Sequence, residues 1–210
     1  MIIGICGLIG SGKGTVADTL IAEHDFKKIS FADALKDGVA TIFNWDRKML
    51  EGDTKNSRDW REKQDDFWSS ETGKEITPRL VLQLFGTDCM REGFFDGVWV
   101  SLVKQKILNN PTQNFVIPDV RFPNEINVIK ELKGEVWQVR RGEKPLWWAT
   151  AISVNQHIDD LQEVHSMNIV FPEVHQSEWR WVSDDKDFDI VIENNSTLED
   201  LKRLVLDRLS

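Results

Sequence analysis

The 210-residue chain contains no tyrosine and only two cysteines, Cys6 and Cys89. Two cysteines are too few for a disulfide framework or a cysteine-rich metal cluster, so we expect both to be core thiols in a reducing compartment. No apolar run approaches the roughly 20 residues that span a bilayer, and the apolar first residues lack the basic segment of a secretory signal. These absences predict a cytoplasmic protein without a membrane segment.

Basic residues are fewer than acidic residues in this chain. Lys and Arg number 26 against 35 Asp and Glu, which gives a net charge of -9 at pH 7. A general nucleic-acid binder draws its affinity from a broad basic surface, so this balance argues against that class. An anionic ligand would have to bind in a local basic cleft, and we expect small molecules as partners.

A glycine-rich turn follows the first apolar run and has the form of a phosphate-binding loop. Residues 7–15 read Gly-Leu-Ile-Gly-Ser-Gly-Lys-Gly-Thr. Glycine allows the positive φ angles that aim successive N–H groups at phosphate oxygens, and the lysine adds a positive charge. A helical pattern over 14–22 would place the positive end of a helix at the phosphates. The residues expected to bind the triphosphate of ATP are Gly7, Gly10, Ser11, Gly12, Lys13, Gly14 and Thr15.

The end of this loop narrows the class of nucleotide-binding protein. Ser or Thr usually follows the lysine, but here Gly14 does so and the hydroxyl comes one place later, at Thr15. This variant resembles the loop of nucleoside monophosphate kinases, which indicates a small-molecule phosphotransferase. A chance glycine-rich turn between a strand and a helix is the alternative.

Five short apolar runs alternate with helical patterns and are expected as strands over 2–6, 28–31, 114–118, 135–140 and 188–192. Such alternation predicts an α/β fold of the P-loop type, with three layers (αβα) and a mostly parallel five-stranded sheet. We expect one kinase domain over 1–210, with its core in 1–44, 77–141 and 188–210. Two segments break the rhythm and are expected as an acceptor-side insertion (45–76) and a lid-like insertion (142–187).

Helix-start signals are clear at two places. Thr77 precedes a proline at the first helical position, and Thr197 precedes an apolar pattern with acidic residues in its first turn. Further helices are expected over 34–43, over 97–108 and after Pro123.

The third expected strand delivers an acidic and a basic residue to the carboxyl edge of the sheet. Asp119 can hold a Mg²⁺-bound water near the phosphates, with Thr15 as the other protein ligand, and the planar guanidinium of Arg121 can bind the transferring oxygens. An Asp–Arg ion pair at a strand end is the alternative. We expect catalysis to involve Lys13, Asp119, Arg121 and Arg141.

Polar residues also follow the last two expected strands. Arg140 and Arg141 can neutralise charge that develops during transfer, although surface solubility explains such a pair equally well. Asn194 can hydrogen-bond the adenine edge of ATP, and a turn with left-handed asparagine is the alternative. Arg140 and Asn194 therefore complete the predicted ATP site.

Arg79 and Gln83 lie four residues apart and therefore on one face of the helix that follows Thr77. The opposite, apolar face contains Leu80, Val81 and Leu84. The polar face can read a monophosphate and a base edge, while a solvated face of an amphipathic helix is the ordinary alternative.

Seven segments, in order along the chain, resemble those of the bacteriophage deoxynucleoside monophosphate kinases. They are the loop at 7–15, the segments 30–36 and 79–88, the Pro-Asp-Val-Arg block at 118–121, the arginine pair at 140–141, the His-Gln-Ser-Glu quartet at 175–178 and the closing segment 189–195. The Arg-x3-Gln-x2-Gly-Thr-Asp block and the His-x-Ser-Glu quartet are the most specific in combination. The resemblance covers most of the chain.

The resemblance implies a fold similar to adenylate kinase and Mg²⁺-dependent transfer of the γ-phosphate of ATP to a deoxynucleoside monophosphate, in the host-cell cytoplasm if a phage encodes the chain. It implies that the substrate monophosphate is contacted by Lys36, Arg79, Gln83, Asp88, His175 and Glu178. A histidine such as His175 can instead cap a helix or anchor a lid. The expected partners are nucleotides, with neither nucleic acid nor membrane, and a homodimer is left open.

Two other functions stay open from the residues alone. One is a P-loop kinase of a non-nucleotide acceptor such as dephospho-coenzyme A, in which Asp33 or Asp88 would serve as the base for an alcohol. The other is a nucleotide-dependent binding or switch protein that keeps the loop but transfers nothing.

Overall fold

The computed structural model describes residues 1–156 and 167–209 and divides the chain into two compact units. The first unit comprises Met1–Ser30 and Lys106–Ser210, and the second comprises Phe31–Gln105. The segment 45–76, expected as an insertion, lies in the second unit, which begins before it and ends after it. Of the expected lid-like insertion 142–187, residues 157–166 lie outside the described residues.

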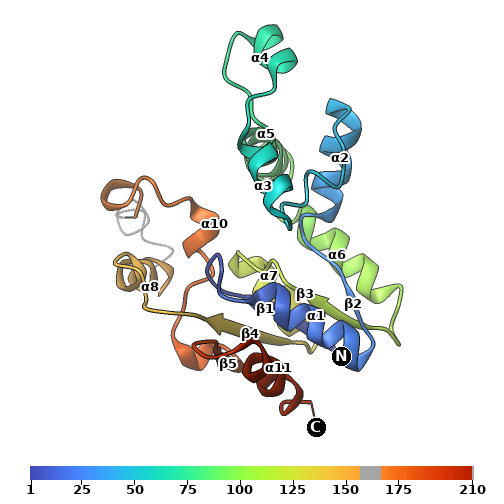
Figure 1. The fold of residues 1–210 in the computed structure, drawn as a ribbon, viewed down its shortest axis with the longest axis vertical. Coiled ribbons are helices and arrows are strands. Elements are labelled where there is room, and N and C mark those ends of the chain that lie inside the picture. The colour runs from blue at the N-terminus through green and yellow to red at the C-terminus, as the bar shows by residue number, and fades with distance from the viewer. Residues whose placement is uncertain (157–166, 210) are drawn as a thin grey trace. The chain divides into compact units, whose positions relative to one another are not determined.

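A five-stranded, fully parallel sheet forms the centre of the first unit (Figure 1). Its strands are β1 (Ile2–Cys6), β2 (Phe26–Lys28), β3 (Asn114–Ile117), β4 (Glu135–Arg140) and β5 (Ile190–Glu193), in the spatial order β2-β3-β1-β4-β5. The predicted α/β class, with five parallel strands between helices, is confirmed. Because all five strands run the same way, their carboxyl ends meet at one edge, where polar residues of distant segments can come together.

Helices cover both faces of this sheet. Those of the first unit are α1 (Lys13–His24), α7 (Pro123–Glu131), α8 (Trp148–Gln156), α10 (Gln176–Trp179), the 3₁₀ helix η2 (Asp185–Asp187) and α11 (Leu198–Leu206). Alternate residues of β1 point to opposite faces, so Ile3 and Ile5 pack in the core with α1 and α11, while Gly4 faces α7. No helix among the described residues is both long and apolar enough to cross a bilayer.

The predicted strand boundaries are correct for β1 and β4, one residue too long for β3, and shifted for β2 and for β5, which begins at Ile190 rather than at residue 188. Asp25, with φ 53, ends α1 directly before the strand, so β2 begins at Phe26 rather than at Lys28. Ile29 and Phe31, whose apolar character suggested the later strand, are buried in the segment that follows. Burial of apolar side chains therefore does not require strand geometry here.

The second unit is helical. It contains α2 (Asp33–Phe43), α3 (Lys55–Glu62), α4 (Asp66–Thr72), α5 (Pro78–Gln83), the π-helix η1 (Leu84–Glu92) and the greater part of α6 (Val98–Leu108). The charge-dense segment 45–76 has an aromatic core of its own. The ring of Trp45 stacks on Phe43 at 4.8 Å and meets Trp60 edge-on at 5.8 Å, and its indole N–H donates to Asp65 Oδ2 at 2.9 Å.

The helix predicted from Thr77 changes type midway. The Thr77 side chain accepts a hydrogen bond from the backbone N–H of Leu80, as predicted for the N-cap, but from Leu84 onward the helix is π-helical. The prediction that both cysteines are buried is wrong for Cys89, which is exposed, whereas Cys6 is buried. A π-helix takes more residues per turn, so the α-helical spacing from Val81 to Cys89 no longer identifies one buried face. Leu84, expected on that apolar face, is likewise exposed.

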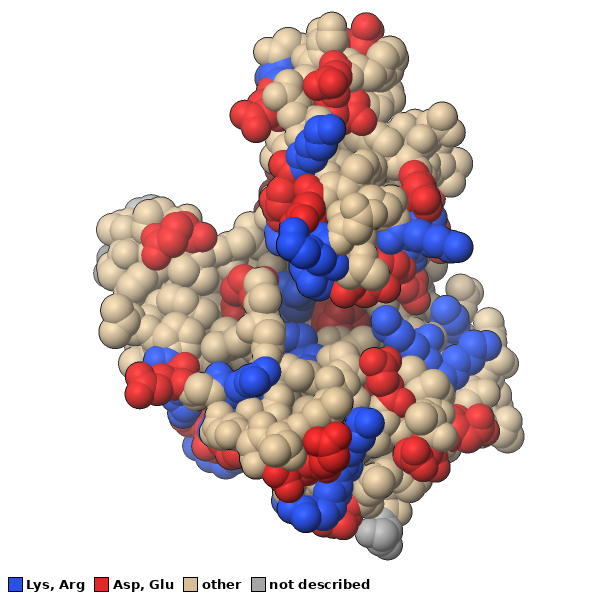
Figure 2. Space-filling view, viewed as in Figure 1, with Lys and Arg blue, Asp and Glu red and all other residues tan. Residues whose placement is uncertain are grey.

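Charged side chains of both signs are interspersed over the face shown in Figure 2. Several charged side chains of the protein form ion pairs within one unit, such as Lys36 with Glu51 at 2.7 Å and Lys144 with Asp185 at 3.9 Å. Exposed pairs such as that of Lys144 with Asp185 contribute little to stability, so the two cores contribute most of it.

Candidate active site

The loop between β1 and α1 has the backbone of a phosphate cradle. Gly7, Gly10 and Gly12 have φ angles of 149°, 78° and 107°, which residues other than glycine rarely adopt. Space is also restricted. A Cβ atom at Gly7 would lie 2.3 Å from the carbonyl oxygen of Val139, and one at Gly12 would lie 2.5 Å from Asn194 Nδ2. Gly7 and Gly12 are therefore required because β4 and the residue that follows β5 pack closely against the loop.

Lys13 is the first residue of α1 and folds back over the loop. Its Nζ donates to the carbonyl oxygens of Gly7 at 2.7 Å and Leu8 at 2.8 Å. Burial lowers the pKa of Lys13 to about 8, and the positive charge of Arg121 acts in the same direction. Glu178 and Asp119 act in the opposite direction. These four side chains, of which three were predicted to be catalytic, thus share one electrostatic environment.

The turn after β3 positions Asp119 and Arg121. The Asp119 carboxylate accepts a hydrogen bond from the Ser30 hydroxyl, which follows β2. Arg121 Nη1 donates to Glu178 Oε1 at 2.6 Å. The alternative of a simple Asp119–Arg121 ion pair is wrong, because within the described part of the chain the ion pair of Arg121 is with Glu178.

Sequence reasoning missed Glu125, which fixes this turn. Its side chain is 2% exposed, and Oε2 accepts the backbone N–H of Arg121 at 2.7 Å and of Phe122 at 3.1 Å. These N–H groups belong to the start of α7, where a buried carboxylate satisfies otherwise unpaired donors. The signal was present in the sequence, as a proline at the first helical position followed two residues later by glutamate.

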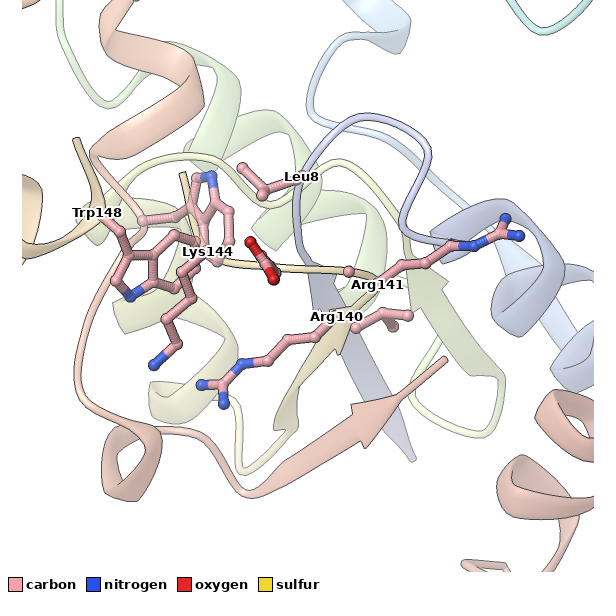
Figure 3. A pocket seen from close by; sticks show the side chains of 9 residues that line it. Leu8, Arg140, Arg141, Lys144 and Trp148 are labelled. Carbon is pink, nitrogen blue, oxygen red and sulfur yellow. The ribbon is translucent and has the colours of Figure 1, made fainter. Parts of the chain in front are cut away.

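The two arginines at the end of β4, Arg140 within the strand and Arg141 directly after it, point in opposite directions (Figure 3). Arg140 Nη1 donates to Asp185 Oδ2 at 2.8 Å and lies 3.5 Å from Glu193, and hydrogen bonding to Asp185 raises its pKa. Arg141 is exposed and forms no ion pair with any residue that the structure describes. Arg141 is therefore available to a ligand, and the contact of Arg140 with ATP stays a prediction.

A pocket lies beside the phosphate loop, at the base of the segment that follows β4 (Figure 3). The rings of Trp148 and Trp181 meet edge-on at 5.6 Å, and Lys144 Nζ lies 5.5 Å from the centre of the Trp148 ring. Leu8 of the loop lines the same pocket. Tryptophans of the expected lid-like insertion thus pack next to the phosphate loop.

Asn194 braces the loop from the end of β5. The side chain is buried, and its Nδ2 donates to the carbonyl oxygen of Ser11 at 2.8 Å. The backbone N–H of Asn194 donates to the carbonyl oxygen of Arg140 at 2.7 Å. The left-handed turn considered as an alternative is wrong, because among the described non-glycine residues only Asp25, Asn44 and Lys133 have positive φ. The predicted contact of Asn194 with adenine stays a prediction.

The quartet at 175–178 contains the N-cap and the first three residues of the short helix α10. The His175 side chain accepts a hydrogen bond from the backbone N–H of Ser177 at 3.3 Å and caps this helix. Helix capping was the alternative to substrate contact for this histidine. Glu178, expected to contact the monophosphate, is paired with Arg121. His175 and Glu178 belong to the first unit, together with the phosphate loop.

The remaining residues expected at the acceptor lie in the second unit. Lys36 Nζ is 2.7 Å from Glu51 Oε2, and Arg79 Nε donates to Glu62 Oε1. Gln83 ends α5, and Asp88 is exposed within the π-helix. The predicted site thus divides between the units, with all of the predicted ATP-binding residues in the first.

Two viral proteins are similar to this chain in sequence. A protein of Acanthamoeba polyphaga mimivirus named "Putative deoxynucleotide monophosphate kinase" is 31% identical over 212 aligned positions, which cover 95% of this chain and 91% of that protein. The "Deoxynucleoside-5'-monophosphate kinase" of Escherichia phage T5 is 39% identical over 56 residues, which cover 27% of this chain and 22% of that protein. No protein-family model matches the sequence.

Solved structures with detectable similarity include two small kinases. Shikimate kinase from Aquifex aeolicus aligns with 14% identity and a TM-score of 0.43, over 100% of this chain and 96% of that one. Dephospho-CoA kinase from Campylobacter jejuni aligns with 15% identity and a TM-score of 0.40, over 99% of this chain and 95% of that one. TM-scores of this size support no argument about activity.

Proposed function

The chain belongs to the deoxynucleoside monophosphate kinases, and we propose that it transfers the γ-phosphate of Mg²⁺-bound ATP to a deoxynucleoside monophosphate, giving the diphosphate. Membership of the family makes it a nucleotide kinase and a phosphotransferase. The ATP and Mg²⁺ requirement and the deoxynucleotide acceptor are the proposed parts.

One observation carries this proposal. The charges of Asp119, Arg121 and Glu178 all act on Lys13, within the glycine loop that follows the central parallel strand β1. A loop of successive N–H groups with two cations suits a chain of phosphates. Tight packing at Gly7 and Gly12 sets the shape of this loop, while a Cβ at Gly10 or Gly14 would meet nothing within 4 Å, which leaves one side open to a ligand.

The residues present suit a magnesium ion. Mg²⁺ prefers oxygen ligands and in nucleotide enzymes is bound by one or two protein groups together with the phosphates. The Thr15 hydroxyl and the Asp119 carboxylate would hold it, directly or through water. When bound, Mg²⁺ would neutralise negative charge on the phosphate oxygens.

The chain's own residues supply positive charge rather than a base. A phosphate monoester has a second pKa near 6, so the acceptor is largely dianionic at pH 7 and its oxygen is already a nucleophile. Repulsion between two anions is then the main barrier to transfer. We propose that Lys13 and Arg121 bind the transferring phosphate oxygens and that Arg141, which is free of ion pairs within residues 1–156 and 167–209, joins them.

Lys36, Arg79, Gln83 and Asp88 are proposed to bind the monophosphate. Lys36 and Arg79 are each paired with a carboxylate, and a phosphate dianion would replace that partner when the monophosphate binds. The amide of Gln83 and the carboxylate of Asp88 can hydrogen-bond a base edge. The base that they select defines the substrate, and a panel of acceptors identifies it.

The test is a measurement of ATP consumption with dTMP, dGMP, dCMP, dAMP and the corresponding ribonucleotides. Stoichiometric formation of a diphosphate is expected with at least one deoxynucleotide. Slow hydrolysis that ignores the acceptor would instead indicate a nucleotide-dependent switch. Transfer to dephospho-coenzyme A but to no nucleotide would indicate the other kinase class.

Replacing Arg79 with alanine should raise the KM for the monophosphate about tenfold, the effect of losing a charged hydrogen bond, while the KM for ATP changes much less. Initial rates with each substrate varied in turn measure this split. Lys74→Ala is the matched control, because Lys74 is an exposed cation of the same unit. An unchanged monophosphate KM in Arg79→Ala would remove Arg79 from the acceptor site.

The affinity for ATP should fall as the pH rises through about 8, the pKa of Lys13 in the folded protein without nucleotide. Lys13 is charged below this pH and attracts phosphate, and it loses its proton above it. Calorimetric titration with ATP on both sides of this pH measures the change. In Arg121→Gln the decline should move to higher pH, because a like charge that lowers the Lys13 pKa is removed. A profile that does not respond to Arg121→Gln would contradict the assignment to Lys13.

A further inference from the structure

An ion pair joins two segments of the first unit that lie 57 residues apart in sequence. Arg121 follows β3, and Glu178 belongs to α10. Their side chains are 39% and 25% exposed, and Arg121 Nη1 lies 2.6 Å from Glu178 Oε1. The pair is thus open enough for a ligand to reach and short enough to define where the guanidinium lies.

The carboxylate end of this pair is anchored. Trp179, the neighbour of Glu178, is 2% exposed, and its carbonyl oxygen accepts a hydrogen bond from Asn155 Nδ2 at 2.9 Å. The same nitrogen donates to the carbonyl oxygen of Val182 at 2.8 Å, and His175 caps the other end of the helix. Glu178 therefore projects from a helix that is fixed to α8.

At the other end, only the backbone of Arg121 is held by its own turn. Glu125 accepts the Arg121 N–H, which fixes the start of α7 but leaves the long side chain unconstrained. Within the described residues, Glu178 is the carboxylate that pairs with this guanidinium. An arginine side chain has about 2 kcal/mol of rotamer entropy, so such a partner strongly affects where the guanidinium spends its time.

The charges around the phosphate loop support the same assignment. Arg121 and Lys13 repel each other, and Glu178 and Asp119 attract Lys13. Without Glu178, two neighbouring cations would favour conformations in which the flexible arginine turns away from Lys13. Glu178 offsets that repulsion while no phosphate is bound.

We propose that Glu178 is a positioning residue that holds the Arg121 guanidinium beside the phosphate loop and acts on transfer through Arg121 rather than through the acceptor. The inference rests on the proposed function, since it assigns Arg121 to the transferring phosphate. It differs from the role that the sequence suggested for Glu178, a direct contact with the monophosphate.

The experiment compares Glu178→Gln, Arg121→Gln, the double variant and the control Glu173→Gln by initial rates. Glu173 is an exposed carboxylate five residues upstream, with no partner among the described residues. Glu178→Gln should lower kcat about two- to fivefold, the range for a partly exposed ion pair, with both KM values nearly unchanged. Glu173→Gln should match the unaltered protein. In the Arg121→Gln background the second substitution should change nothing further, because the group through which Glu178 acts is gone.

Three outcomes would overturn the inference. They are an unchanged kcat in Glu178→Gln, an effect that adds fully to that of Arg121→Gln, and a rise confined to the monophosphate KM, which would mean direct substrate contact. Thermal unfolding of each variant checks that the fold is intact. Failure of the proposed function itself looks different, because the unaltered protein would then form no nucleoside diphosphate.

Discussion

Replacing Lys13 with alanine should lower kcat for phosphoryl transfer about a thousandfold or more while the fold persists. Removing one preorganised cation or donor from a phosphoryl-transfer site has an effect of this size. Within the part of the chain that the structure describes, the Lys13 side chain donates to two carbonyl oxygens of its own loop and to no other group, so its loss leaves β1 and α1 in place. Single-turnover rates and a thermal unfolding curve measure the two effects separately.

Lys27→Ala serves as the control for charge alone. Lys27 is an exposed cation of β2, and its loss changes net charge by the same amount. Its rate should equal that of the unaltered protein. If Lys13→Ala retained a tenth or more of the activity, the glycine loop would not be where the phosphates are handled.

Gly7→Ala should destabilise the protein by about 2 to 4 kcal/mol and abolish ATP binding. The added Cβ would lie 2.3 Å from the carbonyl oxygen of Val139 and 2.8 Å from Ser11 Oγ, at a φ of 149°. Val139 cannot yield, because it is paired with Ile192 in the interior of the sheet. Chemical denaturation and calorimetry with ATP give the two quantities.

Gly14→Ala makes the matched comparison within the same loop. Gly14 lies inside α1, and its added Cβ would meet no atom within 4 Å. Since alanine is the better helix former by about 1 kcal/mol, stability should be equal or higher. Equal destabilisation by both substitutions would mean that backbone packing at Gly7 is not what holds the loop.

The phosphate loop was predictable because its determinants are contiguous in sequence. One short segment contains the strand, the glycines and Lys13, and the same holds for the Thr77 cap. The strand before Asp119 was also visible, which placed that carboxylate at the correct edge of the sheet.

The remaining features depend on contacts between distant segments. No local pattern shows that Arg121 pairs with Glu178, or that Asn194 donates to Ser11 across 183 positions. The π-helix was not predicted, because the residues after Thr77 were assigned an α-helical period throughout, and this misplaced Cys89. The segment 45–76 is polar and charge-dense, yet its tryptophans pack with Phe43, so that aromatic rings from a loop and three helices are in contact.

The hydrogen bond from Asn194 to Ser11 has a consequence for biosynthesis. Asn194 directly follows β5 and is synthesised 183 residues after Ser11, the residue that it braces. A nascent chain can form the first strand and helix long before its cradle is supported. Competence to hold nucleotide should therefore arise only after β5 and Asn194 have been synthesised, and premature termination before β5 should yield a product that cannot bind nucleotide.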